Sequence, residues 1–287
     1  LEACKLKHDR NLINAALHHL CQLEWSRGNI QQCEVYATEA LMRTSRSEQT
    51  ISRANSLLSL SAVQAAQGHI LEARVGMEEA AVILEHLNRS EKQTTVLCNL
   101  AEVYIWQGEW LAGVKLAQKA FQLSERTLHK TGQLHATITM ALAYYAMGQR
   151  DALLVHAQRS LHLSRQLNIP THIVVSNALL AIYHLTTDPI SALVYSQNAL
   201  EQSKHSDPEQ YKAILIILEE ICKHEAGEPL QNIIDDKFEM TLQHLPVPRR
   251  IEGWLFLAQY WIRIGQSEKS TELALSLIHI SEPTRQS

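Results

Sequence analysis

The sequence predicts an all-α, right-handed solenoid of about seven helix pairs, and three observations support that prediction. Glycine is scarce, at ten in 287 residues, yet Gly28, Gly68, Gly108 and Gly148 fall forty residues apart. A large apolar residue followed by a small one recurs eight residues before each of them. Every proline except Pro283 falls at an expected helix boundary, where its missing N–H does least harm. A regular repeat of this length indicates a stacked array of helix pairs.

The first helix of each pair, helix A, is expected to end at the glycine. Glycine takes the left-handed conformation that terminates a helix at little cost. The small residue lies two helical turns earlier and allows a second helix to approach closely. The large–small pairs are Leu20-Cys21, Leu60-Ser61, Leu100-Ala101, Met140-Ala141, Leu180-Ala181 and Leu257-Ala258. The expected hinge positions are Gly28, Gly68, Gly108, Gly148, Asp188, Gly227 and Gly265.

The second helix, helix B, carries its own small–apolar pair about twelve residues after the hinge. These pairs are Ala40-Leu41, Ala80-Ala81, Ala120-Phe121, Ser160-Leu161 and Ala199-Leu200. Pro189 and Pro229 are suited to the start of helix B. Polar links are expected between the helix pairs, at residues 43–49, 87–93, 128–133, 167–172, 204–210 and 244–250. In the sixth copy Glu219-Glu220 stands where the large–small pair belongs, which indicates a register shift or an interruption.

Residues 10–275 resemble the tetratricopeptide repeat family. The best copy runs from Asn99 to Phe121 and has Leu100-Ala101, the aromatic Tyr104 and the hinge Gly108. The period of forty departs from the usual 34 of that family. It resembles instead the superhelical arms of large bacterial ATPase-linked regulators of the maltose-activator and LuxR types. The resemblance implies a binding array and no catalytic site.

Both ends of the chain differ from the repeats. The N-terminal LEACKLKHDR has neither an initiator Met nor an apolar signal segment, which predicts a fragment of a longer protein. The C-terminal LIHISEPTR is similar to a translated sequencing-adapter sequence. We therefore expect a helical repeat domain over residues 1–275 and a non-native tail over residues 276–287. A native tail without regular structure is the alternative.

Composition excludes several classes of protein. The net charge of −4 gives no general attraction to nucleic acid or anionic lipid. No apolar run is long enough for a membrane span. Five scattered cysteines, an odd number, predict unpaired thiols in a reduced, cytoplasmic protein.

No catalytic or cofactor-binding motif stands out. The sequence has neither a GxxxxGK[ST] nor a GxGxxG loop, and neither GxSxG nor HExxH. The fifteen histidines suggest no metal site, because zinc needs about four convergent ligands and His18 and His19 point about 100° apart on a helix. Adjacent carboxylates such as Glu78-Glu79 and Asp235-Asp236 fit a solvated surface. We expect no enzyme, no cofactor and no metal.

Binding is the remaining function. The A helices of such a solenoid line its concave side, and residues 13, 10, 6, 3 and 2 before each hinge should point inward. The candidate ligand-binding residues at or near these phases are His18, Gln22, Trp25, Asn55, Glu102, Trp106, His135 and Tyr145. The aromatic side chains either serve as exposed binding anchors or fill gaps between repeats.

The sequence therefore predicts a non-catalytic module of a cytosolic regulator, in signalling or transcription control. It would bind a protein, a peptide or a small effector, and neither nucleic acid nor membrane. A co-chaperone or assembly scaffold is the alternative, although only Arg263 supplies an inward cation for a carboxylate clamp. Self-association is expected where the repeat ends are exposed, through Trp254, Leu257 and Trp261 at the C-terminal end.

Overall fold

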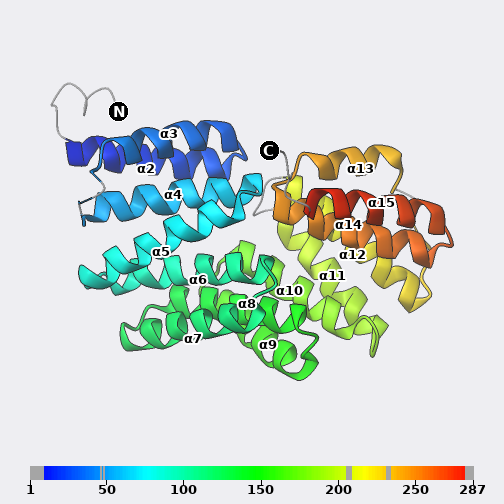
Figure 1. The fold of residues 1–287 in the computed structure, drawn as a ribbon. Helices are drawn as coiled ribbons and strands as arrows, with labels where there is room; N and C mark the ends of the chain where they lie inside the picture. Colours follow the sequence, from blue (N-terminus) through cyan, green and yellow to red (C-terminus); the bar gives the residue numbers. More distant parts are fainter. Residues whose placement is uncertain (1–9, 46, 48, 205–208, 231–233, 282–287) are drawn as a thin grey trace. The chain divides into compact units, whose positions relative to one another are not determined.

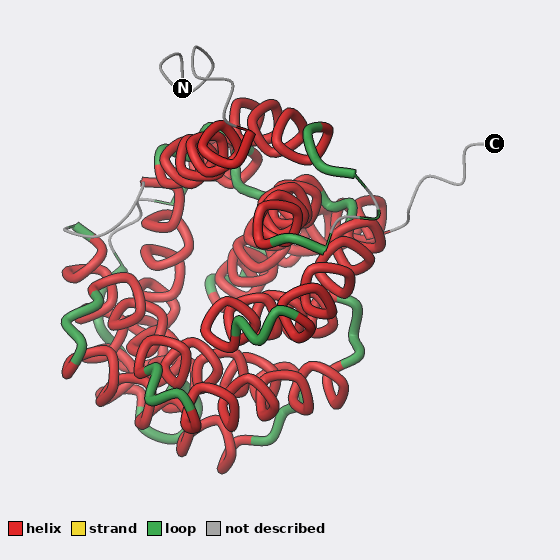
Figure 2. Tube along the Cα trace, turned by 90° about the vertical axis from the view of Figure 1, so that its left-hand side faces the viewer, coloured by secondary structure: helices red, strands yellow, loops and turns green. Residues whose placement is uncertain are grey.

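The computed structural model describes residues 10–45, 47, 49–204, 209–230 and 234–281. Over these residues it contains helices, turns and irregular links, with no β-strand (Figure 2). Consecutive helices pack in antiparallel pairs, and the described part of the chain forms seven such pairs from fourteen helices. The expected all-α repeat fold is confirmed, while its right-handed sense stays a prediction.

The chain divides into two compact units, Leu1–Leu163 and Ser164–Ser287. The helices of unit 1 follow one another along the stack in Figure 1. They are α2 (Arg10–Ser26), α3 (Ile30–Met42), α4 (Ile51–Gln67), α5 (Ile70–His86), α6 (Ser90–Trp106), α7 (Trp110–Arg126), α8 (Lys130–Ala146) and α9 (Arg150–Gln166), whose last residues belong to unit 2. Unit 2 continues with α10 (Pro170–His184), α11 (Pro189–Ser203), α12 (Glu209–Ala226), α13 (Asp236–Gln243), α14 (Val247–Arg263) and α15 (Ser267–Ser281).

The glycine hinges have the backbone conformation that the sequence predicts. Gly28, Gly68, Gly108 and Gly148 have φ values of 75°, 90°, 78° and 67°, and Gly227 and Gly265 have 74° and 79°. At Gly108 the Glu109 N–H then donates to the Tyr104 carbonyl at 2.9 Å, which closes the end of α6. Asp188 is different, because its φ is −149° and its side chain accepts the Ser191 N–H. It begins α11 as an N-cap and is not a left-handed hinge.

The turns between helix pairs are shorter than expected. α6, α8 and α10 begin at Ser90, Lys130 and Pro170, inside the segments predicted to be links. Three non-glycine residues twenty positions after a hinge adopt a left-handed φ of 51–54°, namely Asn88, Leu128 and Asn168. The helix before Leu128 ends with the same kind of hydrogen bond as at Gly108, since the His129 N–H donates to the Ser124 carbonyl at 2.9 Å. One kind of turn therefore recurs every twenty residues, both within and between pairs.

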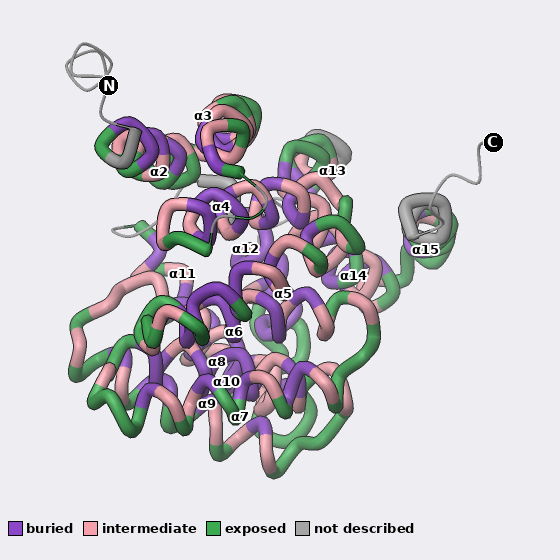
Figure 3. Tube along the Cα trace, turned by 60° about the vertical axis from the view of Figure 1, so that its left-hand side comes forward, coloured by how far each residue is buried: buried purple, intermediate pink, exposed green. Residues whose placement is uncertain are grey.

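Small residues bring the two helices of a pair close together. Ala101 is fully buried, and a Cβ added at Gly113 of α7 would lie 3.0 Å from its carbonyl oxygen. A Cβ added at Gly76 of α5 would lie 2.2 Å from the hydroxyl oxygen of the buried Ser61. Figure 3 shows the buried residues on the sides of the helices that face one another. The large–small pattern therefore marks the contact between helices A and B, as expected.

Unit 2 departs from the sequence prediction in three places. α12 is continuous through Glu219 and Glu220, and the Lys223 ammonium lies 2.9 Å from a carboxylate oxygen of each, so the ion pairs permit burial without a register break. Pro229 does not begin a helix; α13 starts only at Asp236 and has eight residues.

The third departure concerns the residues expected to mediate self-association. Trp254, Leu257 and Trp261 are buried in the core of unit 2, with Tyr260 and Leu273 beside them in the same apolar cluster. The prediction that they form an exposed end was wrong, because α15 packs on α14. α15 extends to Ser281 and so includes residues 276–281 of the predicted non-native tail, while residues 282–287, with Pro283, lie outside the described residues.

Candidate functional site

The A helices of unit 1 contact one another along the stack. α2 contacts α4, α4 contacts α6, and α6 contacts α8, whereas the described B helices of neighbouring pairs make no comparable contacts. Closer spacing on one side curves the stack toward that side, so the A helices line the inner side of unit 1. We call the inward-facing stripe of these helices the inner wall. By their helical phase we assign to it the candidate residues His18, Gln22, Trp25, Asn55, Glu102, Trp106, His135 and Tyr145.

Exposure along a single A helix follows the predicted phase. In α6 most residues from Gln93 onward are buried, and the ones left partly exposed include Thr95, Asn99 and Glu102, at steps of three or four. Trp106 continues the stripe at the end of the helix. A step of three or four places side chains on one helix face. The inner wall is therefore a continuous stripe on this helix.

The three aromatic side chains of the wall stay accessible. Trp25, Trp106 and Tyr145 are 39%, 43% and 38% exposed. A residue that filled a gap in the core would be almost fully buried. Their exposure favours the binding-anchor interpretation over the packing one.

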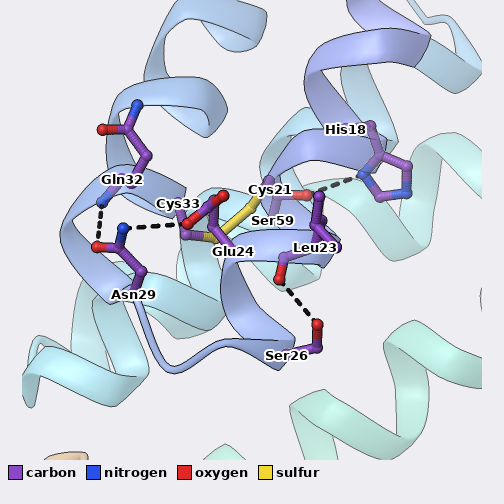
Figure 4. The surroundings of a disulfide bond; sticks show 9 residues. All are labelled: His18, Cys21, Leu23, Glu24, Ser26, Asn29, Gln32, Cys33 and Ser59. Carbon is purple, nitrogen blue, oxygen red and sulfur yellow. Dashed lines mark hydrogen bonds between the residues drawn. A yellow bond between two sulfur atoms is a disulfide. The ribbon is translucent and has the colours of Figure 1, made fainter.

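Polar side chains of the wall join consecutive A helices. His18 Nδ1 lies 2.9 Å from the Ser59 hydroxyl, so α2 is linked to α4 (Figure 4). The Lys92 ammonium donates to Asn55 Oδ1 at 3.0 Å, which links α6 to α4. These bonds fix the positions of neighbouring A helices relative to one another. The groups that make them use part of their hydrogen-bonding capacity in doing so.

Glu102 is the polar centre of the wall between α6 and α8. Its Oε1 lies 3.3 Å from His135 Nε2 and 3.5 Å from the Thr139 hydroxyl, which donates to it. His135 and Glu102 both keep about a quarter of their side-chain surface exposed. A ligand with an amide or hydroxyl group can therefore reach this cluster from the open side.

Burial sets the charge state of His18. It lowers the pKa of the imidazole to about 4, and the positive charge of Lys92 and the neighbouring His19 act in the same direction. His18 is therefore a neutral hydrogen-bonding group near pH 7.

The sequence alone did not select every wall residue. Lys92 and Asn99, at sixteen and nine residues before Gly108, keep part of their surface accessible, while the buried hydroxyls of Ser59 and Thr139, each nine before a hinge, bond to His18 and Glu102 from below the surface. The inward phases used for the prediction place residues ten before the hinge on the wall, yet Cys98 and Ile138 at that phase are buried. In α6 the three-residue and four-residue steps from Thr95 to Glu102 could have suggested Asn99, nine residues before Gly108.

Two cysteines are paired, contrary to expectation. Cys21 of α2 and Cys33 of α3 form a disulfide with a Cα–Cα distance of 4.3 Å (Figure 4). Both occupy the small-residue positions where helices A and B of the first pair touch, so close packing brings the sulfurs together. Cys98 and Cys222 are free, and burial raises the pKa of the Cys222 thiol to about 11. The argument for a cytoplasmic location from unpaired thiols does not hold for Cys21 and Cys33.

Among the described residues, no three His, Cys, Asp or Glu side chains come together in a group that could hold a metal ion. None of the described helices combines the length and the apolar character needed to cross a bilayer.

Neither a protein-family model nor a curated protein sequence matches the chain. Solved structures do match. Aspartyl phosphate phosphatase F from Bacillus subtilis superposes with a TM-score of 0.66 at 12% identity, over 99% of this chain and 74% of its own. A Rap protein complexed with Competence and Sporulation Factor gives 0.68 at 14% identity, over 93% of this chain and 74% of its own.

A third structure carries the repeat in its description. It is a signal-transduction ATPase with numerous domains and a tetratricopeptide repeat sensor, from Pyrococcus horikoshii, with a TM-score of 0.59 at 14% identity. The chain has a tetratricopeptide-type repeat fold. The match covers 94% of this chain but only 43% of that ATPase. At such low identity, the tetratricopeptide-type architecture is what these structures share with the chain.

Proposed function

We propose that the inner wall of unit 1 recognises a peptide or a small effector, and that the chain is a non-catalytic binding module. The observation that carries the proposal is the set of half-exposed aromatic side chains, Trp25, Trp106 and Tyr145, on the same wall as the Glu102 cluster. Aromatic anchors with a few placed polar groups are typical of recognition surfaces. A wall fixed by bonds between its helices loses little freedom when a ligand binds.

The structural neighbours support a regulatory setting by analogy. One was crystallised with Competence and Sporulation Factor, and another is a signal-transduction ATPase whose repeat is described as a sensor. A module of a larger signalling or transcription regulator fits both. The co-chaperone alternative gains no support from Arg263, because that guanidinium pairs with Glu225 at 2.7 Å.

Trp106 tests the proposal, with Trp110 as its matched control. Trp106 lies on the wall in α6, while Trp110 begins α7, and the two are 43% and 42% exposed. Linear peptides selected from a phage-displayed library on the intact chain serve as the probe. We expect Trp106→Ala to weaken peptide binding by more than about 1 kcal/mol, roughly fivefold, with little change in melting temperature. Trp110→Ala should leave binding unchanged.

Two results would count against the wall as the binding site. Selected peptides that bind wild type, Trp106→Ala and Trp110→Ala equally well would place binding elsewhere. A loss of stability of about 3–5 kcal/mol in Trp106→Ala would show a core residue, because that is the cost of a large cavity. Trp25→Ala and Tyr145→Ala, measured in the same way, test the rest of the aromatic set.

A further inference from the structure

Glu102 and Trp106 lie one helical turn apart on the inner wall. Both belong to the accessible stripe of α6, where 22% of the Glu102 side chain and 43% of Trp106 are exposed. Residues four apart on a helix have Cβ atoms roughly 5–6 Å apart. Long helical side chains lean toward the N-terminus of their helix, which directs the indole of Trp106 toward the turn that carries Glu102. A carboxylate and an aromatic ring are therefore accessible side by side.

The other two aromatic side chains of the wall have uncharged neighbours one turn earlier. The residues three and four positions before Trp25 and Tyr145 are Cys21, Gln22, Ala141 and Leu142. Of the three aromatic anchors, Trp106 is the one preceded by a carboxylate at this spacing. A preference for a charged group is therefore expected at Trp106 and not at the other two.

Side chains of α8 hold the carboxylate of Glu102 in place. The Thr139 hydroxyl donates to its Oε1 at 3.5 Å, and His135 Nε2 lies 3.3 Å from the same oxygen. A neutral imidazole donates here when its proton is on Nε2, and the carboxylate then keeps its negative charge. Burial raises the pKa of the Cys98 thiol, and the negative charge of Glu102 adds to this effect. A carboxylate has about four lone-pair sites, so Glu102 can also accept N–H groups of a ligand from its open side.

A carboxylate beside an indole is suited to a cation. The face of an indole attracts positive charge, and a carboxylate forms an ion pair with it. A guanidinium satisfies both groups at once because it is planar: its face stacks on the indole while N–H groups at its edge donate to the carboxylate. An ammonium is compact and strongly hydrated, so it loses more when it leaves water. The arrangement therefore favours arginine over lysine.

Lys92, a cation on the same stripe, is too far away to occupy this place. It lies ten residues before Glu102, about 15 Å along α6, which exceeds the screening length of about 8–10 Å at physiological salt. Its ammonium donates to Asn55 at 3.0 Å instead. We propose that Glu102 and Trp106 form a subsite for a cationic side chain of a peptide ligand, and that arginine fits it best. This subsite rests on the proposed function of the inner wall, to which it adds the charge of the ligand.

Peptide selection on charge variants tests the subsite. Linear peptides are selected from a phage-displayed library on the intact wild-type chain and on Glu102→Gln. We expect arginine to be enriched among wild-type peptides that depend on Trp106, and the enrichment to be lost on Glu102→Gln. That variant keeps an oxygen that can accept from Thr139, so it should melt as wild type does. Glu125→Gln, at an exposed position of α7, is the matched control for the loss of one charge and should leave the enrichment unchanged.

Synthetic versions of one selected peptide then locate the guanidinium, with isothermal titration calorimetry as the measurement. Exchange of its arginine for citrulline, which has nearly the same shape but no charge, should weaken binding to wild type about tenfold. The same exchange should cost about threefold or less on Glu102→Gln, since the charged partner is gone. A lysine version should bind wild type with an affinity between the other two. The comparison on wild type needs no variant of the chain, so it decides even if Glu102→Gln folds poorly.

The possible results separate this subsite from the proposed function. Trp106-dependent peptides that bind wild type equally well with arginine and with citrulline would overturn the subsite and leave the proposed function standing. An equal loss on wild type and on Glu102→Gln would show that the guanidinium lies away from Glu102, which also overturns the subsite. Peptides that bind independently of Trp106 would instead contradict the proposed function, and the subsite with it.

Discussion

At the scale of single residues, the protonation of His18 on the inner wall makes the folding stability depend on pH. Its imidazole is neutral in the folded chain because burial lowers its pKa to about 4. An unfolded chain restores the ordinary value of about 6.5. Between these two pH values the unfolded chain binds the extra proton and the folded chain does not, so stability falls as pH drops through this window. Above about pH 6.5 the effect is absent.

His18→Gln should remove this part of the pH dependence while keeping a side chain that can bond to Ser59. We expect wild type to lose on the order of 1 kcal/mol more than His18→Gln between pH 7.5 and pH 4.5, a modest figure because the ring is only partly buried. Urea unfolding at the two pH values measures it. His19→Gln, on the exposed side of the same helix, should behave as wild type does. Equal losses in wild type and His18→Gln would rule the mechanism out.

The sequence predicted which residues of a single helix are accessible, but not the contacts that join different helices of the wall. Helical phase alone placed Glu102, Trp106 and Tyr145 on accessible positions, because exposure on one helix depends only on its periodicity. The bond from Lys92 to Asn55 depends on the tilt and spacing of α4 and α6, which no single-helix pattern contains. The Cys21–Cys33 bond was missed for the same reason, since it depends on how closely α2 and α3 pack.

At the scale of elements, some turns could be predicted from the sequence and others could not. The glycines predicted the turns within pairs. Asparagine, which stands at positions 88 and 168, also tolerates the left-handed conformation but predicts it less strongly. Leu128 carries no such sign, yet its φ is 54°. The polar residues that suggested links form the first turns of α6, α8 and α10 instead, because polar residues are also favoured at helix starts.

Leu128→Gly should stabilise the chain. Leucine in the left-handed region costs about 1–2 kcal/mol, and the greater flexibility of glycine in the unfolded chain offsets part of the gain. Leu128 is 78% exposed, so little packing is lost. We expect a net gain of about 0.5–1 kcal/mol in the free energy of unfolding, measured by urea denaturation.

The matched control is Leu111→Gly, near the start of α7. Leu111 is also largely exposed, but it lies within the helix, so the same substitution should cost up to about 1 kcal/mol there. A loss of stability in both variants would mean that Leu128 makes contacts that outweigh its backbone conformation.

At the scale of the whole molecule, the proposed boundary at Leu275 can be tested by truncation. α15 buries Leu273 in the core of unit 2, while the expected repeat pattern stops after Leu275. A chain that ends after Leu275 should melt within about one or two degrees of the full chain. A chain that ends after Gln266 removes α15 and should melt several degrees lower, since Trp261 and its neighbours lose their cover. Differential scanning calorimetry of the three chains compares them, and a large loss at Leu275 would show that the tail packs.

The recurring turn has a consequence for how such a molecule changes in evolution. Left-handed residues at 68, 88, 108, 128, 148 and 168 bound five successive helices, α5 to α9, which have the same length and the same junction. Forty residues between equivalent junctions make up one helix pair, so their gain or loss keeps every A helix in the position of an A helix. Gain or loss of twenty residues would put a B helix in the position of an A helix, with the wrong face toward its neighbours. Recombination within the gene can therefore lengthen or shorten the array in whole steps and alter the reach of its inner surface, without inventing a new junction.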